Sequence, residues 1–186
     1  KPVGKKGQEL LVEPADRKKT GSLFRWKPDL EVFTDINIPV DYYLDVMKRQ
    51  AVVNAGITFR FRNQVDSKFE TTEFCYEHGI LDYVNELTEG DALTLPQFWE
   101  VKLSAAFCFS NRVTALEYYH NSSWLENGGA PDKAARNGFV YAIDAYIKQA
   151  GKYTKNESKI TFQDVADCLV LVTNCFSTQT SYENQT

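Results

Sequence analysis

Long apolar runs are missing from this sequence of 186 residues. No stretch approaches the roughly 20 apolar residues that a helix needs to span a bilayer. The opening residues, KPVGKKG, also lack the apolar segment of a signal peptide. These absences predict a cytoplasmic protein with no membrane partner. Because the chain starts without an initiator Met and ends in a polar run without a helix stop signal, we expect a segment of a longer protein.

Signatures of metal binding and of catalysis are also absent. The four cysteines contain no C-x-x-C pair, and three of them lie in apolar strand patterns, which predicts reduced core thiols and no metal site. The two histidines, His78 and His120, have no neighbouring nucleophile or carboxylate in catalytic spacing, so we assign them a structural or surface role. No catalytic triad and no phosphate-binding loop appears. We therefore expect no catalytic residue within the chain.

The composition is that of a globular protein, with 43% hydrophobic and 25% charged residues, and its length favours a single substantial core. A net charge of −4 argues against a nucleic-acid interface over the whole surface. Any contact with DNA must therefore be local.

The strongest structural signal is the run from Cys168 to Phe176, CLVLVTNCF, which is almost continuously apolar and β-branched. Such a run is typical of a strand that is buried on both faces. The residues that follow it, 177–186, are rich in hydroxyl and amide groups. This polar tip suits contact with a polar ligand or partner, and a frayed terminus is the alternative.

Periodicity and turn signals predict the remaining elements. We expect strands over 22–27 and 57–62, the second pairing with 68–76 as a hairpin, and helices over 40–54 and from Gly79 to about Gly90. We expect a further hairpin of strands 98–109 and 112–119 joined at Ser110-Asn111, then a helix of about 18 residues that begins at Pro131-Asp132 and is closed by Gly151. Thr161 and Asp164 resemble a capping box of a short helix. The order predicts an α+β fold, a mixed β-sheet covered by helices.

Several short motifs occur in the order and spacing of one protein family. They are Thr20–Asp29 (TGSLFRWKPD), Val53–Ile57 (VNAGI), Phe74–Ile80 (FCYEHGI), Asn127–Gly129 (NGG), Thr161–Asp167 and Glu183–Thr186 (ENQT). Together they resemble the second, transducer domain of the ATPase subunit of bacterial type IIA topoisomerases, found in the gyrase B subunit and its topoisomerase IV counterpart. The resemblance covers about Gly7 to Thr186. The chain departs from it at Ala130-Pro131, where the family has Thr-His.

The resemblance implies a ribosomal-protein-S5-domain-2-like transducer fold with a left-handed βαβ crossover. Residues 1–19 would be a linker or edge segment from the upstream ATPase domain, and residues 20–186 the transducer domain, truncated before its C-terminal helix. Gln185, with Thr186, would lie in the loop that reaches the γ-phosphate of ATP in the neighbouring domain. A side-chain amide can donate to a phosphate oxygen, so this loop would report whether the γ-phosphate is present.

The implied function is to couple ATP binding and hydrolysis to DNA segment capture and strand passage. The parent would be an ATP-hydrolysing DNA topoisomerase, an isomerase that uses ATP and Mg, whereas this chain alone would bind neither cofactor and would not be catalytic. The implied partners are DNA, the topoisomerase A subunit and a second B subunit, with the isolated chain a monomer. Basic side chains would contact DNA phosphates without reading bases. The candidates are Lys48, Arg49, Arg60, Arg62, Arg112, Lys133 and Arg136, for each of which a solvated surface charge is the alternative.

One competing hypothesis is a free-standing α+β module that binds nucleic acid or protein without an ATPase. It explains the expected fold but not the Gln185-Thr186 end. A small-molecule kinase of related fold fails because the sequence has no glycine-rich phosphate loop. The sequence leaves open whether the parent supercoils or decatenates DNA.

Overall fold

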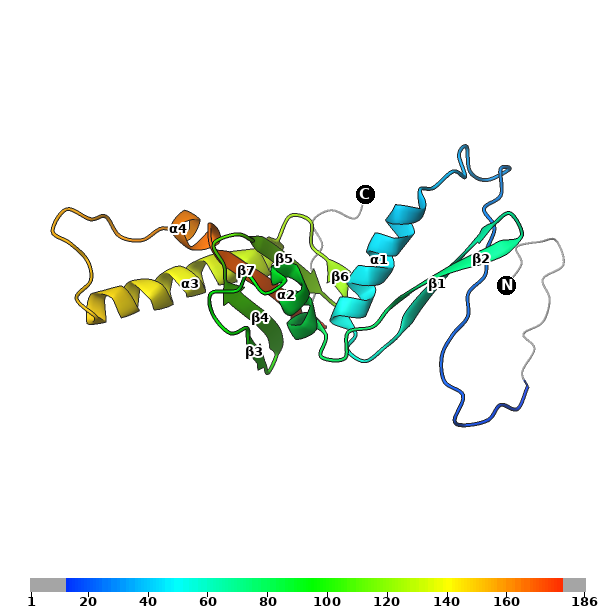
Figure 1. Ribbon diagram of the computed structural model, residues 1–186, viewed down its shortest axis with the longest axis horizontal. Helices are drawn as coiled ribbons and strands as arrows, with labels where there is room; N and C mark the ends of the chain where they lie inside the picture. The colour runs from blue at the N-terminus through cyan, green and yellow to red at the C-terminus, as the bar shows by residue number, and fades with distance from the viewer. Residues whose placement is uncertain (1–12, 179–186) are drawn as a thin grey trace. The chain divides into compact units, whose positions relative to one another are not determined.

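The computed structural model describes residues 13–178, and the chain divides into two compact units, Lys1–Ile38 and Pro39–Thr186. The second unit contains every helix and strand of the described residues (Figure 1). It begins later than residue 20, where the motifs place the start of the transducer domain, so that domain boundary stays a prediction. No helix in the described part of the chain is long and apolar enough to cross a membrane.

The described part of the first unit consists of turns and extended chain. Three aspartates stabilise its bends by accepting backbone N–H bonds two residues further on, as Asp29 does from Glu31 at 2.9 Å. The strand predicted over 22–27 is wrong for this structure, because no described segment pairs with it and Leu23 and Phe24 remain 85% and 79% exposed. An isolated strand leaves its backbone groups without partners, so alternation of side chains alone does not form one.

The second unit opens with a helix and a hairpin that match the predictions. Helix α1 (Val40–Val53) follows Pro39, and strands β1 (Phe59–Val65) and β2 (Lys68–Phe74) pair antiparallel. Phe61 stacks on Tyr43 of α1 with ring centroids 5.4 Å apart, while Arg60 and Arg62 alternate with it on the exposed face. Helix α2 (Ile80–Thr88) confirms the second predicted helix.

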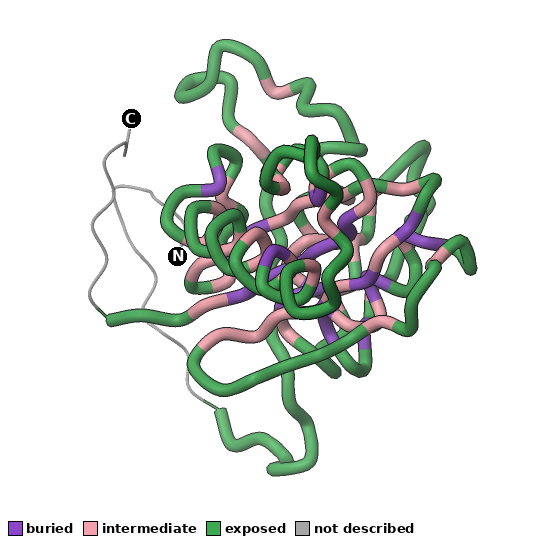
Figure 2. The backbone as a smooth tube through the Cα atoms, turned by 90° about the vertical axis from the view of Figure 1, so that its left-hand side faces the viewer, coloured by how far each residue is buried: buried purple, intermediate pink, exposed green. Residues whose placement is uncertain are grey.

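The predicted buried strand is the centre of a five-stranded sheet. Strand β7 (Leu169–Cys175) pairs antiparallel with β4 (Leu103–Phe109) and parallel with β5 (Ala115–His120). Strands β3 (Gln97–Glu100) and β6 (Ser123–Trp124) complete the order β3-β4-β7-β5-β6. Buried residues gather where the helices cross this sheet (Figure 2). The mixed sheet confirms the α+β class.

The hairpin predicted at Ser110-Asn111 is wrong, because β7 lies between the two strands that it would join. Ser110 is buried and does not turn the chain back: its backbone N–H donates to the Cys168 carbonyl at 2.8 Å and its hydroxyl to the Asp91 carbonyl at 2.9 Å. The predicted strand 98–109 is instead divided at Val101, and β3 folds back on β4. The strand that is apolar on both faces takes the central place, where two neighbours can pair with it.

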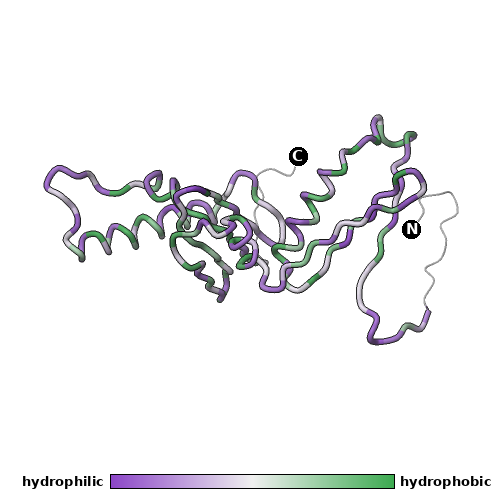
Figure 3. The backbone as a smooth tube through the Cα atoms, viewed as in Figure 1, coloured by the Kyte–Doolittle hydropathy of each residue, from purple (hydrophilic) through white to green (hydrophobic). Residues whose placement is uncertain are grey.

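The connection from β5 to β7 runs through two helices, α3 (Gly129–Gln149) and α4 (Phe162–Ala166). This βαβ crossover agrees with the prediction, while its hand stays a prediction. The capping box is confirmed, since the Asp164 carboxylate accepts the Thr161 backbone N–H and hydroxyl, both at 2.7 Å. Hydrophobic residues continue along α3 (Figure 3). Within α3, Phe139 packs in the core, whereas Tyr146 is 64% exposed.

Two of the family-like motifs meet where α1 ends and α2 begins. The Gly56 N–H donates to the Tyr76 carbonyl at 2.9 Å. Gly79 has a φ of +56°, and a Cβ there would lie 3.1 Å from the Val52 carbonyl oxygen and 3.2 Å from the Ala55 Cβ. A glycine is required because both the left-handed backbone and the close approach disfavour a side chain.

We expect Gly79→Ala to lower the free energy of unfolding by about 2 kcal/mol, because it adds both left-handed strain and a steric contact. Gly151 is the matched control, since its φ is +61° and nothing lies within 4 Å of the added Cβ. Gly151→Ala should lower it by only about 1 kcal/mol. Urea unfolding measures the free energy of unfolding of both variants. An equal decrease in the two would show that the packing around Gly79 is not tight.

Candidate functional site

The polar tip leaves the sheet at the end of β7, next to the turn between β5 and β6. The Asn121 side chain holds this exit with two hydrogen bonds: its Nδ2 donates to the Ser177 carbonyl and its Oδ1 accepts the Ser177 N–H, both at 3.0 Å. The Asn121 backbone N–H donates to the Cys175 carbonyl at 2.9 Å. Gln185 and Thr186, the candidate phosphate-contacting residues, lie outside the described residues.

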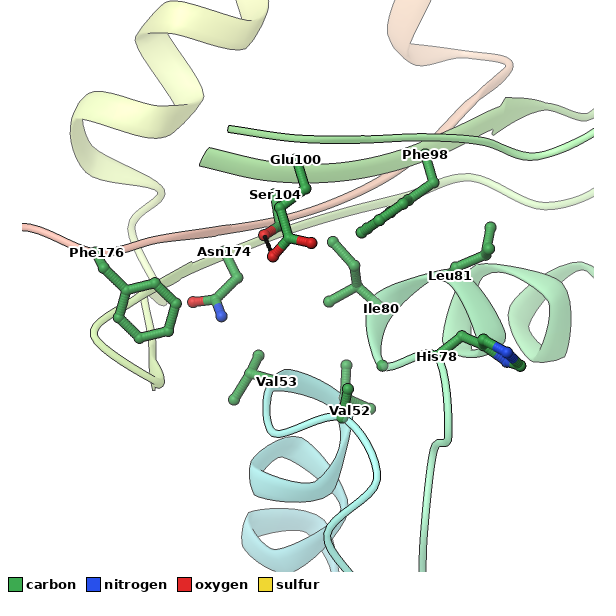
Figure 4. Close-up of a pocket in the computed structure, with 12 residues that line it drawn as sticks. Val52, Val53, His78, Ile80, Leu81, Phe98, Glu100, Ser104, Asn174 and Phe176 are labelled. Carbon is green, nitrogen blue, oxygen red and sulfur yellow. Dashed lines mark hydrogen bonds between the residues drawn. The ribbon is translucent and has the colours of Figure 1, made fainter. Parts of the chain in front are cut away.

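A groove of about 400 Å³ adjoins this exit, between the ends of α1 and α2 and the strands β3, β4 and β7 (Figure 4). Val53, Ile80 and Phe98 are among its apolar lining residues. Asn174 also lines it, is 5% exposed, and its Oδ1 has no hydrogen-bond partner within the described residues. Within the lining, the Ser104 hydroxyl donates to the Glu100 carboxylate at 3.1 Å (Figure 4). A few polar groups set among apolar side chains are typical of a binding site.

A polar cluster joins α1 and α2. Lys48 donates to Glu86 at 2.6 Å, and the Tyr76 hydroxyl donates to the same carboxylate at 2.7 Å. Burial opposes ionisation of Glu86, but the hydrogen bonds from Lys48 and Tyr76 outweigh it and lower the pKa of the carboxyl. Burial, followed by the bond to Glu86, raises the pKa of Tyr76 above the usual range of a phenol. The tyrosine thus acts as a hydrogen-bond donor and the glutamate as an anion.

A second carboxylate extends the cluster to the sheet. Glu117 of β5 accepts the hydroxyl of Tyr83 at 2.9 Å and that of Tyr119 at 2.7 Å. Burial is the main cause of the raised pKa of both phenols, and the neighbouring Glu117 charge adds to it. Arg49 of α1 also contacts the sheet, with its guanidinium carbon 3.6 Å from the centre of the Trp124 ring in β6. The helices are therefore fixed to the sheet by polar bonds as well as by apolar packing.

The seven basic candidates come from α1, β1, the β4–β5 loop and α3. Five form ion pairs with neighbouring carboxylates, namely Lys48 with Glu86, Arg49 with Asp45, Arg60 with Glu73, Arg112 with Asp91 and Arg136 with Asp132. Arg62 lies over the Phe69 ring, and Arg136 also lies over Phe162. Lys133 makes no ion pair or ring contact with the described residues. Their role in DNA contact stays a prediction.

The histidines and cysteines take part in local contacts. The His78 Nδ1 lies 3.1 Å from an Asp82 carboxylate oxygen, and the His120 Nδ1 lies 3.1 Å from the Cys175 sulfur. All four cysteines are free: Cys108 is buried, Cys168 and Cys175 are half-buried, and Cys75 is exposed. In the part of the chain that the structure describes, no group of three or more His, Cys, Asp or Glu residues could hold a metal ion.

Sequence reasoning missed Asn121 and its partner Ser177. Asn121 lies in a polar, turn-rich stretch in which no pattern separates a structural amide from a solvated one. The one signal that could have found it is the Asn-Ser-Ser sequence after the strand, since asparagine tolerates the left-handed backbone of a tight turn.

The mixed sheet, with its parallel β5–β7 pair and helices on both faces, defines an α+β protein. Two solved structures share this fold. The 43K ATPase domain of Thermus thermophilus gyrase B, solved with an aminocoumarin, has a TM-score of 0.62 at 21% identity, over 84% of this chain and 44% of that one. The topoisomerase IV ATP-binding domain of Francisella tularensis, solved with a small-molecule inhibitor, has a TM-score of 0.66 at 23% identity, over 86% and 44%.

The family profile described as DNA gyrase B matches residues 79–186. The chain belongs to this family, which confirms the resemblance seen in the motifs. Curated relatives include the DNA gyrase B subunit of Metamycoplasma hominis, 24% identical over 90% of this chain and 28% of the relative. Another is the DNA topoisomerase 4 B subunit of Rickettsia felis, 21% identical over 98% and 30%. The chain thus spans less than a third of the length of these relatives.

We expect the Glu86 contacts to stabilise the fold in a pH-dependent way. Because the folded pKa of Glu86 is lowered, its stabilisation is present above the usual carboxyl pKa of about 4.3 and is lost as pH falls through the lower folded value. Glu86→Gln should therefore cost about 0.5 kcal/mol at pH 7 and progressively less in acid. Urea unfolding at a series of pH values measures this, with the exposed Glu70→Gln as control. A cost independent of pH would contradict the ionic role.

Proposed function

We propose that the chain is the transducer region of an ATP-dependent type II DNA topoisomerase, within its B subunit, and that it couples ATP binding and hydrolysis to DNA segment capture and strand passage. The observation that carries the proposal is the family match over residues 79–186, which includes β7 and the polar tip after it. The parent protein would use ATP and Mg, act on DNA with an A subunit in the cytoplasm, and pair with a second copy of itself. The transducer chain alone would supply no catalytic residue and would be monomeric.

The architecture supports the transmission of movement from the end of β7 to the whole sheet. Strand β7 is buried over Leu169–Asn174 and is hydrogen-bonded on both sides, so a displacement at its end is transmitted to the sheet as a whole. The polar cluster fixes α1 and α2 to the same sheet. In this mechanism the side-chain amide of Gln185 donates to the γ-phosphate of ATP bound in the preceding domain. Hydrolysis removes that contact and lets the two domains rotate.

The first test uses the natural full-length protein. We expect Gln185→Ala to lower ATP turnover at least tenfold, which corresponds to about 1.4 kcal/mol of transition-state stabilisation. The control is Gln149→Ala at the exposed end of α3, which removes the same side-chain amide from a residue outside the family-like motifs. Steady-state assays with and without DNA give kcat and KM. Unchanged turnover in Gln185→Ala would refute the phosphate contact and favour a free-standing binding module.

The second test concerns DNA. Lys133 makes no ion pair with the described residues, so its charge is available to a phosphate. We expect Lys133→Gln to reduce the slope of log K against log salt by about 0.9, the value for one lost phosphate contact. Lys159→Gln is the control, because Lys159 is an exposed lysine that is not among the candidate residues. Titration of the full-length protein with a duplex at several salt concentrations measures both slopes, and equal slopes in the two variants would remove Lys133 from the interface.

A further inference from the structure

The turn after β5 has a backbone that few residues adopt. Asn121 and Ser122 have φ values of +48° and +62°, so both lie in the left-handed region. Asparagine is among the few residues other than glycine that tolerate this region well. Unlike glycine, it also brings an amide group, and this structure uses both ends of that amide.

The amide of Asn121 extends the pairing of β5 with β7 beyond the last strand residues. The backbone register ends with His120 opposite Cys175. Past that point, the Asn121 side chain donates to the Ser177 carbonyl and accepts the Ser177 N–H, each at 3.0 Å. A side chain thus takes the place that a neighbouring peptide group would occupy in a longer sheet. The chain leaving β7 is held in one direction until Ser177.

The turn that carries Asn121 is itself anchored to α1. The Gln50 side chain donates to the Ser122 carbonyl at 2.9 Å. Arg49 places its guanidinium carbon 3.6 Å from the centre of the Trp124 ring in β6. Because the turn is fixed from a helix as well as from the sheet, it can hold Ser177 firmly.

We propose that Asn121 is a positioning residue that sets the direction in which the chain leaves β7 toward Gln185. The inference rests on the proposed function, because it gives the Gln185 loop its fixed root. Gln185 lies eight positions after Ser177 in the sequence, a span that reaches at most about 29 Å when fully extended. The direction of the chain at Ser177 therefore sets which region Gln185 can reach. Holding the root reduces the conformations that the tip must sample before it meets a phosphate.

Three substitutions separate the amide from the backbone. Asn121→Gly keeps the left-handed backbone at no steric cost and removes both bonds to Ser177. Asn121→Asp keeps the acceptor for the Ser177 N–H but loses the donor to its carbonyl. Asn111→Gly is the control, because Asn111 lies in an exposed bend and its side chain makes no hydrogen bond to the described residues.

In the natural full-length protein we expect Asn121→Gly to lower kcat for ATP hydrolysis about fivefold, with KM for ATP within about twofold of the wild type. The reason is that ATP binds in another domain, while the tip contributes at the transition state. Asn121→Asp should recover part of the loss, and Asn111→Gly should match the wild type. Hydrogen exchange should show roughly tenfold faster exchange of the Ser177 amide in Asn121→Gly, with the Leu171 amide of β7 unchanged.

Each other outcome is decisive. If Gln185→Ala lowers turnover and Asn121→Gly does not, the positioning role is overturned and the proposed function stands. If Gln185→Ala has no effect, the proposed function fails and the positioning role fails with it. If Asn121→Gly also speeds exchange at Leu171, the residue supports the sheet in general, and its role in directing the tip is overturned.

Discussion

The burial of β7 on both faces is the constraint from which the second unit follows. Val170 and Val172 face the layer of α1 and α2, whereas Leu169 and Leu171 face α3 and α4. A strand with apolar groups on both sides must be covered twice and paired twice, because each unpaired or uncovered group would lose burial or hydrogen bonds. This requirement places β4 and β5 on either side of it and brings the crossover helices over the second face.

The same constraint explains why the exit of β7 can act as a fixed root. A central strand resists local unfolding more than an edge strand does, because hydrogen bonds to both neighbouring strands would have to break. The residues that follow it therefore begin from a fixed position. Beyond the last paired residues of β5 and β7, the hydrogen bonds from the Asn121 side chain to the Ser177 backbone hold the chain in the same way. The polar cluster around Glu86 and Glu117 likewise holds the helices to the sheet through directional hydrogen bonds. Stiffness at both places is what a domain needs to transmit movement.

The sequence predicted the elements whose formation depends on nearby residues. It failed for those whose formation depends on a partner far along the chain. Helical periodicity found α1, α2 and α3, and continuous apolar character found β7, because these signals depend on residues within one or two turns of each other. The Ser110-Asn111 pair suggested a hairpin, but burial across more than 50 residues of chain selects β7 as the neighbour of β4. Alternation over 22–27 gave a strand pattern without supplying a partner for it. Asn121 stayed hidden for the same reason, since its role depends on Ser177.

The basic residues raise the question of how an acidic chain could contact DNA. Six of the seven candidates are already engaged with carboxylates or rings, which lowers the positive potential that they present. Exposed ion pairs contribute only about 0–1 kcal/mol, however, so exchanging a carboxylate for a phosphate costs little. The release of counterions from DNA then supplies the drive for binding. Pairing on the free surface is therefore compatible with the proposed local phosphate contact.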